Sequence, residues 1–264
     1  MPDRSSRVHR EVVSYVRRSE RMNPSQEKAW ATHADRLLVT VPARELDTSV
    51  HPEAHVAWAS VFGREAPVIV EIGSGRGEAL VALAATHPEA NVVAFEVFAP
   101  AIASSLSRIA RHGVENVRIV RANGAEGLEH LFAPDSLTQV WTFFPDPWHK
   151  ARHHKRRLVG PEFAALVVSR LVPGGLWRLA TDWEDYALSM RAVLDSAPGL
   201  VNVHHGWAPR WPERPVTKYE ARGLAAGRAV FDLTYRRTPT DDASAAGDLL
   251  HRTPRPDASG EVAQ

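Results

Sequence analysis

Short apolar runs with strand character alternate with helical periods through the middle of the chain, and this alternation limits the possible folds most. Five runs have the length and composition of buried strands: Val68–Ile72, Val92–Glu96, Val117–Arg121, Thr138–Phe144 and Leu176–Thr181. Helical periods occupy Glu78–Thr86, Pro100–His112, Gly124–Phe132, Pro161–Leu171 and Trp183–Leu194. Strands that alternate with helices at this spacing form right-handed βαβ crossovers. We therefore predict an α/β fold with a mostly parallel sheet and helices on both faces.

The remaining elements lie before and after this alternating region. Asn23 followed by Pro24 has the residue types of a helix N-cap and first turn, so a helix is expected to begin there. Val203–His205 and Ala229–Arg236 are weaker strand candidates, and the second alternates apolar and polar residues as an antiparallel edge strand does. We expect a single domain over residues 23–237.

The two ends of the chain differ in charge. Residues 1–21 carry six arginines against three acids, and we expect residues 1–22 to form a basic, partly disordered arm. Residues 238–264 carry five acids against two arginines and few apolar side chains. A segment of that composition cannot bury enough apolar surface to become ordered, so we expect a disordered acidic tail.

Composition excludes several classes of protein. The 264 residues include no cysteine, which excludes disulfides and zinc sites built on Cys. The longest apolar run, Ala79–Ala85, has seven residues and is too short to span a membrane. No apolar segment of a secretory signal follows the N-terminus. We expect a cytoplasmic protein with no membrane contact; a monomer and a homodimer fit the sequence equally well.

The first predicted strand leads into a glycine turn at Gly73, Gly75 and Gly77. Glycines let the backbone approach a ligand closely at the carboxyl edge of a parallel sheet, where open α/β folds bind their ligands. Glu71 precedes the turn, and Glu96 ends the second strand, where its carboxylate can accept hydrogen bonds from ribose hydroxyls. A glycine turn by itself is equally compatible with a plain strand–helix connection.

Two observations favour S-adenosylmethionine over a dinucleotide at this turn. The dinucleotide fingerprint G-x-G-x-x-G needs a third glycine where this chain has Glu78. A pyrophosphate would be repelled by Glu71 and Glu78, whereas the ammonium and sulfonium of S-adenosylmethionine are attracted by carboxylates. The turn is thus similar to that of class I methyltransferases, and a dehydrogenase is the alternative.

The end of the fourth predicted strand carries the most specific pattern. Asp146 lies between two prolines that stiffen the loop, and Trp148 offers a flat ring on which a nucleobase can stack. Five cations follow within nine residues, a number that suits the neutralisation of phosphates: Lys150, Arg152, Lys155, Arg156 and Arg157. Each feature alone is ordinary, but together, beside a cofactor turn, they indicate an RNA substrate.

These motifs resemble the bacterial tRNA (guanine-N7)-methyltransferase family, over roughly residues 12–237. The resemblance is most specific in the FPDPWHK loop and in the RPVTKYE segment, whereas the glycine turn is shared by many methyltransferases. The matching segments are Tyr15–Met22, Glu71–Gly77, Phe144–Lys150 with Arg152–His153 and Lys155–Arg157, Ala180–Asp182, and Arg214–Gly223.

The resemblance implies a Rossmann-like class I methyltransferase fold with a seven-stranded sheet, S-adenosylmethionine as cofactor and tRNA as partner. It implies methylation of N7 of the variable-loop guanine at position 46, and it implies no metal. Asp146 would be the catalytic residue. Cofactor contacts would come from Glu71, Gly73, Gly75, Glu96, Asn123 and Asp146. Substrate contacts would come from Lys150, Asp182, Thr217, Lys218, Tyr219 and Glu220.

Two positions depart from the family pattern. Asn123 replaces an aspartate, although an amide oxygen can still accept a hydrogen bond from the adenine amino group. Glu20 replaces a glycine in the arm.

Alternatives remain at this stage. The fourth-strand loop is also similar to the Asp-Pro-Pro-aromatic loop of amino-methylating enzymes, so another RNA N-methyltransferase is one alternative. A non-catalytic RNA-binding protein on the same fold is another. His149 and His153 have helical spacing for a metal, but the cations around them disfavour one. Trp207 and Trp211 suit either a cover over the substrate cleft or core packing.

Overall fold

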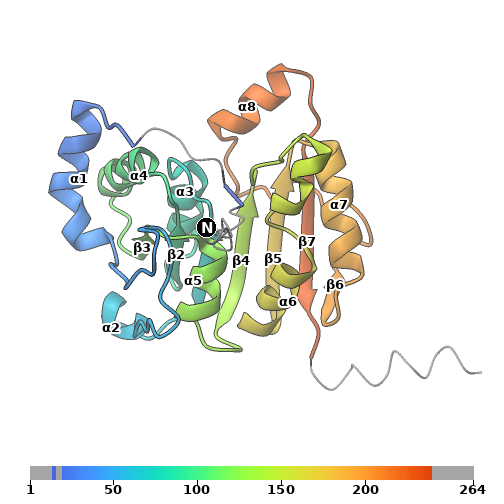
Figure 1. Ribbon diagram of the computed structural model, residues 1–264, viewed down its shortest axis with the longest axis horizontal. Helices are drawn as coiled ribbons and strands as arrows, with labels where there is room; N and C mark the ends of the chain where they lie inside the picture. Colours follow the sequence, from blue (N-terminus) through green and yellow to red (C-terminus); the bar gives the residue numbers. More distant parts are fainter. Residues whose placement is uncertain (1–13, 16–19, 240–264) are drawn as a thin grey trace, which may run out of the picture.

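The computed structural model describes residues 14–15 and 20–239, and there seven strands form one sheet in the order β3-β2-β1-β4-β5-β7-β6 (Figure 1). The strands are β1 Val68–Ile72, β2 Asn91–Phe95, β3 Val117–Val120, β4 Leu137–Phe143, β5 Leu171–Thr181, β6 Leu200–Asn202 and β7 Phe231–Arg237. Strands β1 to β5 pair in parallel, whereas β7 runs antiparallel to both β5 and β6. This arrangement confirms the predicted α/β fold with an antiparallel edge. The edge strand is β6, however, and the segment Ala229–Arg236, expected at the edge, forms β7 inside the sheet because β6 pairs with its outer side.

Helices cover both faces of the sheet. One face packs against α1 Pro24–Leu37, α3 Glu78–Thr86 and α4 Ala99–His112. The other packs against α5 Gly124–Leu131, α6 Pro161–Arg170 and α7 Glu184–Asp195. The short α2 Trp58–Phe62 lies at the lower left of Figure 1, and a 3₁₀-helix, η1 Ala151–Arg156, follows β4.

Side chains of each central strand alternate between these two layers. In β2, Val92 and Ala94 join the layer of α3 and α4, whereas Val93 and Phe95 join the layer of α5 to α7. Every residue of this strand is buried, as expected for a strand covered on both faces. The helix expected after Asn23 is present, because the Asn23 side chain accepts a hydrogen bond from the Gln26 amide at 3.0 Å and caps α1.

The strand order reverses between β1 and β4, and this reversal positions the functional site. Connections from β1 run to β2 and β3 on one side, whereas β4 and β5 lie on the other. The loops at the carboxyl ends of β1 and β4 therefore diverge and leave a crevice, the usual ligand site of such sheets. Helix α8 Lys218–Ala225 stands beyond the carboxyl ends of β4 and β5 rather than on a face of the sheet (Figure 1).

Most predicted strands differ from the observed ones by one or two residues at their ends, but two differ by more. The late strand expected at Val203–His205 lies earlier, at Leu200–Asn202, because the Asn202 side chain accepts from the His204 amide and donates to the Gly206 carbonyl, which turns the chain. Strand β5 begins at Leu171 rather than Leu176, and its pairing with β4 shifts register across the Pro173–Gly174 bend.

The predictions for the terminal arm and tail concern mainly residues 1–13, 16–19 and 240–264, which lie outside the described residues. Among the helices of the described part, none is long and apolar enough to cross a membrane. The same part of the chain contains no group of His, Cys, Asp or Glu side chains that could hold a metal ion.

Candidate active site

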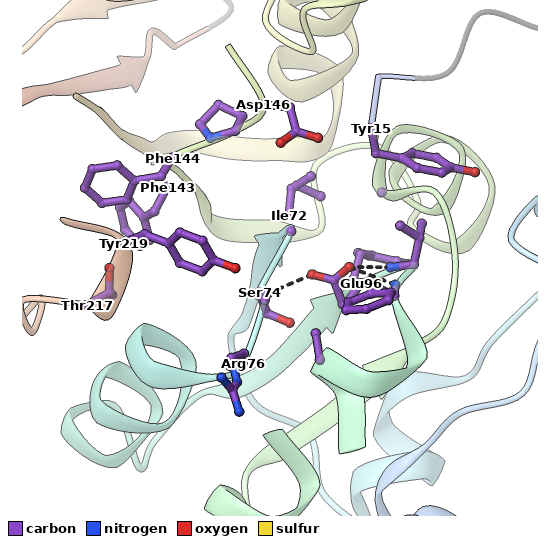
Figure 2. A pocket seen from close by; sticks show the side chains of 18 of the residues that line it. Tyr15, Ile72, Ser74, Arg76, Glu96, Phe143, Phe144, Asp146, Thr217 and Tyr219 are labelled. Carbon is purple, nitrogen blue, oxygen red and sulfur yellow. Dashed lines mark hydrogen bonds between the residues drawn. The ribbon is translucent and has the colours of Figure 1, made fainter. Parts of the chain in front are cut away.

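A cleft of about 860 Å³ opens at the carboxyl ends of β1, β2, β4 and β5. Its walls include the glycine turn, the loop after β4, the first turn of α8, and Ser14 and Tyr15 of the N-terminal segment (Figure 2). Of the predicted site residues, nine line this cleft: Glu71, Gly73, Gly75, Glu96, Asn123, Asp146, Asp182, Thr217 and Tyr219. Lys150, Lys218 and Glu220 do not line it.

The glycine turn needs glycine for two different reasons. Gly73 and Gly75 have φ values of +76° and +54°, and a Cβ at either position would meet no neighbour within 4 Å. Both therefore supply the left-handed backbone that the turn requires and leave its surface open to a ligand. A Cβ at Gly77 would lie 2.7 Å from the Ser105 Oγ, so this glycine permits the close packing of α3 against α4.

Glu71 is a buried carboxyl group at the base of the cleft. Its side chain is 2% exposed, and its Oε2 has no hydrogen-bond partner among the described residues. Burial, and then the nearby Glu96 carboxylate, raises the pKa of Glu71 to about 8. A carboxyl group in this state has unused capacity for a cationic hydrogen-bond donor. The ammonium of S-adenosylmethionine is such a donor, so this end of the cleft fits the expected cofactor.

Glu96 is held at the cleft wall by backbone amides. Its Oε2 accepts from the Gly75 amide at 2.8 Å, and its Oε1 accepts from the amides of Val97 and Phe98 at 2.8 and 2.9 Å. These donors join the end of β2 to the glycine turn and fix the orientation of the carboxylate. The predicted contact with ribose hydroxyls thus has a preorganised acceptor.

Asn123 has a structural task that the sequence pattern did not indicate. Its side-chain oxygen accepts a hydrogen bond from the Ala125 backbone amide at 3.0 Å and caps α5. The backbone amide of Asn123 donates to the Thr48 carbonyl at 2.6 Å. An asparagine caps a helix as well as an aspartate does. The departure from the family pattern therefore preserves the local backbone and changes only the charge beside the predicted adenine position.

The loop that carries Asp146 lies between two residues with left-handed backbone. Phe144 has φ +50° and Trp148 has φ +44°, values that cost energy for a large side chain. Pro145 and Pro147 flank Asp146 between them, so the surrounding structure fixes the direction of this carboxylate. Figure 2 shows Asp146 on the opposite side of the cleft from Glu96.

The basic segment after this loop divides into two kinds of cation. Lys150, Arg152 and Lys155 are exposed to solvent. The Arg157 side chain is only 5% exposed, pairs with Asp185, and donates to the Pro147 carbonyl at 3.0 Å. The hydrogen bond that the Arg157 side chain donates to the Asp185 carboxylate holds the pKa of Asp185 below its usual range. Lys150, Arg152 and Lys155 thus face solvent, whereas Arg157 fixes the loop.

Trp148 is held by its neighbours. Its indole Nε1 donates to the Ser14 carbonyl at 2.9 Å, and the Arg156 guanidinium lies 5.0 Å from the ring centroid. The His153 ring meets it edge-on at 5.8 Å. One visible task of this tryptophan is therefore to tie the N-terminal segment to the loop after β4.

Tyr219 and Thr217 present the start of α8 to the cleft. Thr217 caps the helix by accepting from the Glu220 amide at 3.2 Å. The Tyr219 side chain is 49% exposed and extends toward the centre of the cleft beside Phe143 (Figure 2). Lys218 reaches the surface, and its backbone amide donates to Glu78 at 2.6 Å.

Glu220 differs from the other predicted substrate residues. It is 1% exposed, and its carboxylate accepts from Arg214 at 2.8 Å and from Arg210 at 3.2 Å. The Glu220 side chain thus forms ion pairs inside the protein and does not line the cleft. The structure does not bring Glu220 together with the predicted substrate residues.

Asp182 lies at the end of β5 against the body of α8. Its Oδ2 accepts from Arg228 at 2.8 Å, and a Cβ added at Gly223 would overlap this carboxylate. The glycine of the RPVTKYEARG segment therefore permits α8 to lie directly on Asp182. Sequence reasoning missed Arg228, Ser14 and Tyr15 as cleft residues, and Arg228 lies outside every motif.

The weaker aromatic candidates belong to the protein interior. Trp211 packs against Trp141, with ring centroids 5.6 Å apart, and Arg178 lies 4.2 Å from its ring. Trp207 packs against Phe231 at 5.0 Å. Neither lines the cleft, so core packing is the correct alternative of the two.

Comparisons with known proteins show the family of this chain. Residues 65–233 match the model of a family described as "Putative methyltransferase". The chain is 54% identical over 234 residues to the tRNA (guanine-N(7)-)-methyltransferase of Cutibacterium acnes, which covers 88% of this chain and 85% of that protein. It is 53% identical over 228 residues to that of a Nocardioides species, over 86% and 88% of the two chains.

Among solved structures, the 16S rRNA methyltransferase KamB matches with a TM-score of 0.49 and 18% identity, over 69% of this chain and 93% of that chain. The extent and identity of the curated relatives, together with the strand order and the cleft, identify the protein. The chain belongs to the tRNA (guanine-N(7)-)-methyltransferase family of S-adenosylmethionine-dependent class I enzymes.

Proposed function

We propose that this enzyme methylates N7 of the variable-loop guanine at position 46 of tRNA. The names of its relatives support tRNA and guanine N7, and the family resemblance supports the position. The observation that carries the proposal is the single cleft in which Glu71 and Glu96 face Asp146, Asp182 and Tyr219. We call the part of the cleft with Glu71 and Glu96 the cofactor side, and the part with Asp182, Thr217 and Tyr219 the substrate side.

Methyl transfer to guanine N7 requires the protein mainly to position the two reactants and to stabilise positive charge. S-adenosylmethionine, when bound, supplies a methyl group on a positively charged sulfur. Guanine N7 has an exposed lone pair at neutral pH, so no residue has to remove a proton from it. The residues of the cleft then contribute by aligning the two reactants and by stabilising positive charge that moves toward the purine.

Asp146 has the charge and the rigidity for this second task. It lies on a loop whose backbone is constrained at Phe144 and Trp148, and it projects into the cleft. A carboxylate whose direction is fixed before the reaction does not have to reorganise during it. We assign it the catalytic role and a contact with the cofactor.

Three further groups suit recognition of guanine and its nucleotide. Asp182 accepts hydrogen bonds, which matches the N1–H and amino donors of guanine. Thr217 and Tyr219 line the same cleft at the start of α8, where an aromatic ring can stack on a base. Lys150, with the other exposed cations of the same segment, suits phosphates at the cleft mouth. Glu220 is left out of this set because it is buried.

The test is incubation of the wild-type enzyme with unmodified tRNA and methyl-labelled S-adenosylmethionine, followed by chemical cleavage at N7-methylated guanines. We expect one cleavage site, at position 46, and no labelling of a matched tRNA with adenine at that position. Labelling that persists in the adenine variant, or label on an exocyclic amine, would favour another RNA N-methyltransferase. Absence of label in every tRNA would contradict an enzymatic role.

A further inference from the structure

Arg214 is a fully buried arginine in the segment that precedes α8. Its side chain has no exposure to solvent, and it donates to Glu220 at 2.8 Å and to both oxygens of Asp232 at 3.0 and 3.1 Å. Neither Arg214 nor either carboxylate lines the cleft. A direct contact of this group with the cofactor or a base is therefore not its task.

Burying these charges is an expensive way to stabilise a fold. A buried ion pair often contributes no more stability than well-packed apolar side chains of the same volume, because desolvation offsets the attraction. What such a pair can provide is a unique relative position of the elements that carry it. The value of Arg214 thus depends on which elements it joins.

Arg214 contacts three elements on the substrate side of the cleft: α8, β7 and the loop after β4. Glu220 lies in the first turn of α8, directly after the cleft residues Thr217 and Tyr219. Asp232 lies on β7 and pairs with Ala180 of β5. Ala180 in turn lies two residues before Asp182. The loop after β4 is the third element.

That third contact is aromatic. The Arg214 guanidinium carbon lies 5.3 Å from the Phe144 ring centroid and 5.5 Å from that of Phe143. Phe144 has the left-handed backbone that begins the Asp146 loop, and its amide donates to the Ala180 carbonyl at 2.7 Å. The guanidinium therefore packs on the residue from which the direction of Asp146 is set.

We propose that Arg214 is a positioning residue that aligns α8, the end of β5 and the Asp146 loop for methyl transfer, with Glu220 and Asp232 as its anchors. The inference rests on the proposed function, since it concerns the substrate side of that site. It reassigns Glu220, which the family resemblance places among the substrate contacts, to the support of Arg214. The cofactor side, built on Glu71 and Glu96, shares none of these contacts.

The experiment compares Arg214→Met and Arg214→Lys with a matched control, Arg237→Met. Arg237 is also buried, lies on the same strand as Asp232, and pairs with Asp135 and the Leu171 carbonyl at the opposite edge of the sheet. Each variant is assayed for thermal unfolding, for cofactor affinity by calorimetry, and for the single-turnover rate constant at saturating tRNA, below its melting temperature.

We expect Arg214→Met to lower the single-turnover rate constant by roughly 100-fold, the loss typical of a misplacement of about 1 Å. Its cofactor affinity should stay within about threefold of wild type, because Glu71 and Glu96, to which we assign cofactor contacts, share no hydrogen-bond partner with Arg214 among the described residues. Arg214→Lys should lose about tenfold, since an ammonium cannot replace the bidentate geometry. Arg237→Met should melt earlier yet transfer methyl at nearly the wild-type rate.

A folded Arg214→Met enzyme with the wild-type rate would overturn the inference, and so would an equal loss in Arg237→Met. If Arg214→Met does not fold, a wild-type single-turnover rate constant in Arg214→Lys would contradict the inference. The rate is measured at whichever guanine the wild type modifies. A different modified position would therefore contradict the proposed function while leaving this measurement intact.

Discussion

The two sides of the cleft are built by different interactions. On the cofactor side, the Glu96 carboxylate accepts hydrogen bonds from three backbone amides. One belongs to Gly75 of the glycine turn, and the other two belong to Val97 and Phe98, which directly follow Glu96. On the substrate side, the supporting contacts are ion pairs between side chains of different elements: Asp182 with Arg228, Glu220 and Asp232 with Arg214, and Asp185 with Arg157. The first side depends on local backbone geometry, whereas the second depends on ion pairs between elements that tertiary folding brings together.

The largest effect is expected at Asp146, where the two sides meet. Asp146→Ala should reduce the single-turnover rate constant by roughly 100- to 1,000-fold, because a preorganised charge next to the reacting atoms is lost. The affinity for tRNA should stay nearly unchanged. Rapid-quench measurement of methyl transfer, together with filter binding of tRNA, checks both expectations.

Asp146→Asn is the matched variant, because it keeps the shape and removes the charge. A comparable loss in Asp146→Asn identifies charge as the cause. Substantial turnover by Asp146→Ala would contradict the catalytic assignment and would leave the two sides of the cleft without a shared reactive group.

The cofactor side should be most sensitive at Gly77. Gly77→Ala places a Cβ 2.7 Å from Ser105 at a φ of +72°, so overpacking and backbone strain add. We expect the free energy of unfolding to fall by about 2–4 kcal/mol. Chemical denaturation measures this change.

Gly113→Ala is the control, because Gly113 has a similar φ of +64° and its added Cβ meets nothing within 4 Å. It should lose only the backbone part, about 1–2 kcal/mol. Equal losses in the two variants would show that the packing of α3 on α4 does not limit the glycine turn.

Cofactor affinity should depend on pH through Glu71, whose pKa burial raises to about 8. Below that value the carboxyl group is mostly protonated in the free protein, whereas a cationic ligand favours its ionised form. Binding should then release a proton, and affinity should rise by up to about tenfold per pH unit between pH 6 and 8. Calorimetry in two buffers of different ionisation enthalpy checks the proton release.

The same shift has a consequence for stability with the opposite sign. Because the folded pKa lies above the ordinary value of 4.5, the contribution of Glu71 to the stability of the cofactor-free protein is fully present below pH 4.5 and is lost as the pH rises toward 8. Glu71→Gln should remove both pH dependences. If it leaves the dependence of cofactor affinity in place, another group is titrating.

The smallest effect is expected in the basic segment, where the division into exposed and buried cations can be tested. Lys155→Gln should weaken tRNA binding a few-fold and reduce the slope of log affinity against log salt by about 1, without changing stability. Arg157→Gln should lower the melting temperature, mainly through its lost bond to the Pro147 carbonyl. The pair with the exposed Asp185 adds little in water.

Filter binding over a salt series and thermal melts measure the two variants side by side. An unchanged salt slope in Lys155→Gln would show that this cation is only solvated. Unchanged stability in Arg157→Gln would show that it does not fix the loop.

The difference between the two sides also explains what the sequence predicted. Alternating apolar runs indicated the parallel sheet, and the turn at Gly73 and Gly75 with Glu96 indicated the cofactor side, because each of these signals lies within a short stretch of chain. The position of Asp146 after β4 followed from the same rule about strand ends.

The substrate side resisted prediction because its supporting contacts are ion pairs between side chains of different elements. The sequence pattern does not show that Arg214 and Arg210 pair with the Glu220 carboxylate, and Arg228 reaches Asp182 from outside every motif. The late strand was misplaced for a different reason, since a local turn made by the Asn202 side chain ends it. The ion-pair partners are set by tertiary packing, whereas the Asn202 turn is a local feature that the apolar pattern does not reveal.

The independence of the two sides is tested most directly by titrating S-adenosylmethionine into Arg214→Lys and Glu96→Gln in parallel. Glu96→Gln should lose roughly 10- to 100-fold in cofactor affinity, because it weakens charge-assisted hydrogen bonds. Arg214→Lys should bind the cofactor within about threefold of wild type. A loss of cofactor affinity in Arg214→Lys as large as that in Glu96→Gln would contradict the account, since it would show that the two sides are one coupled structure.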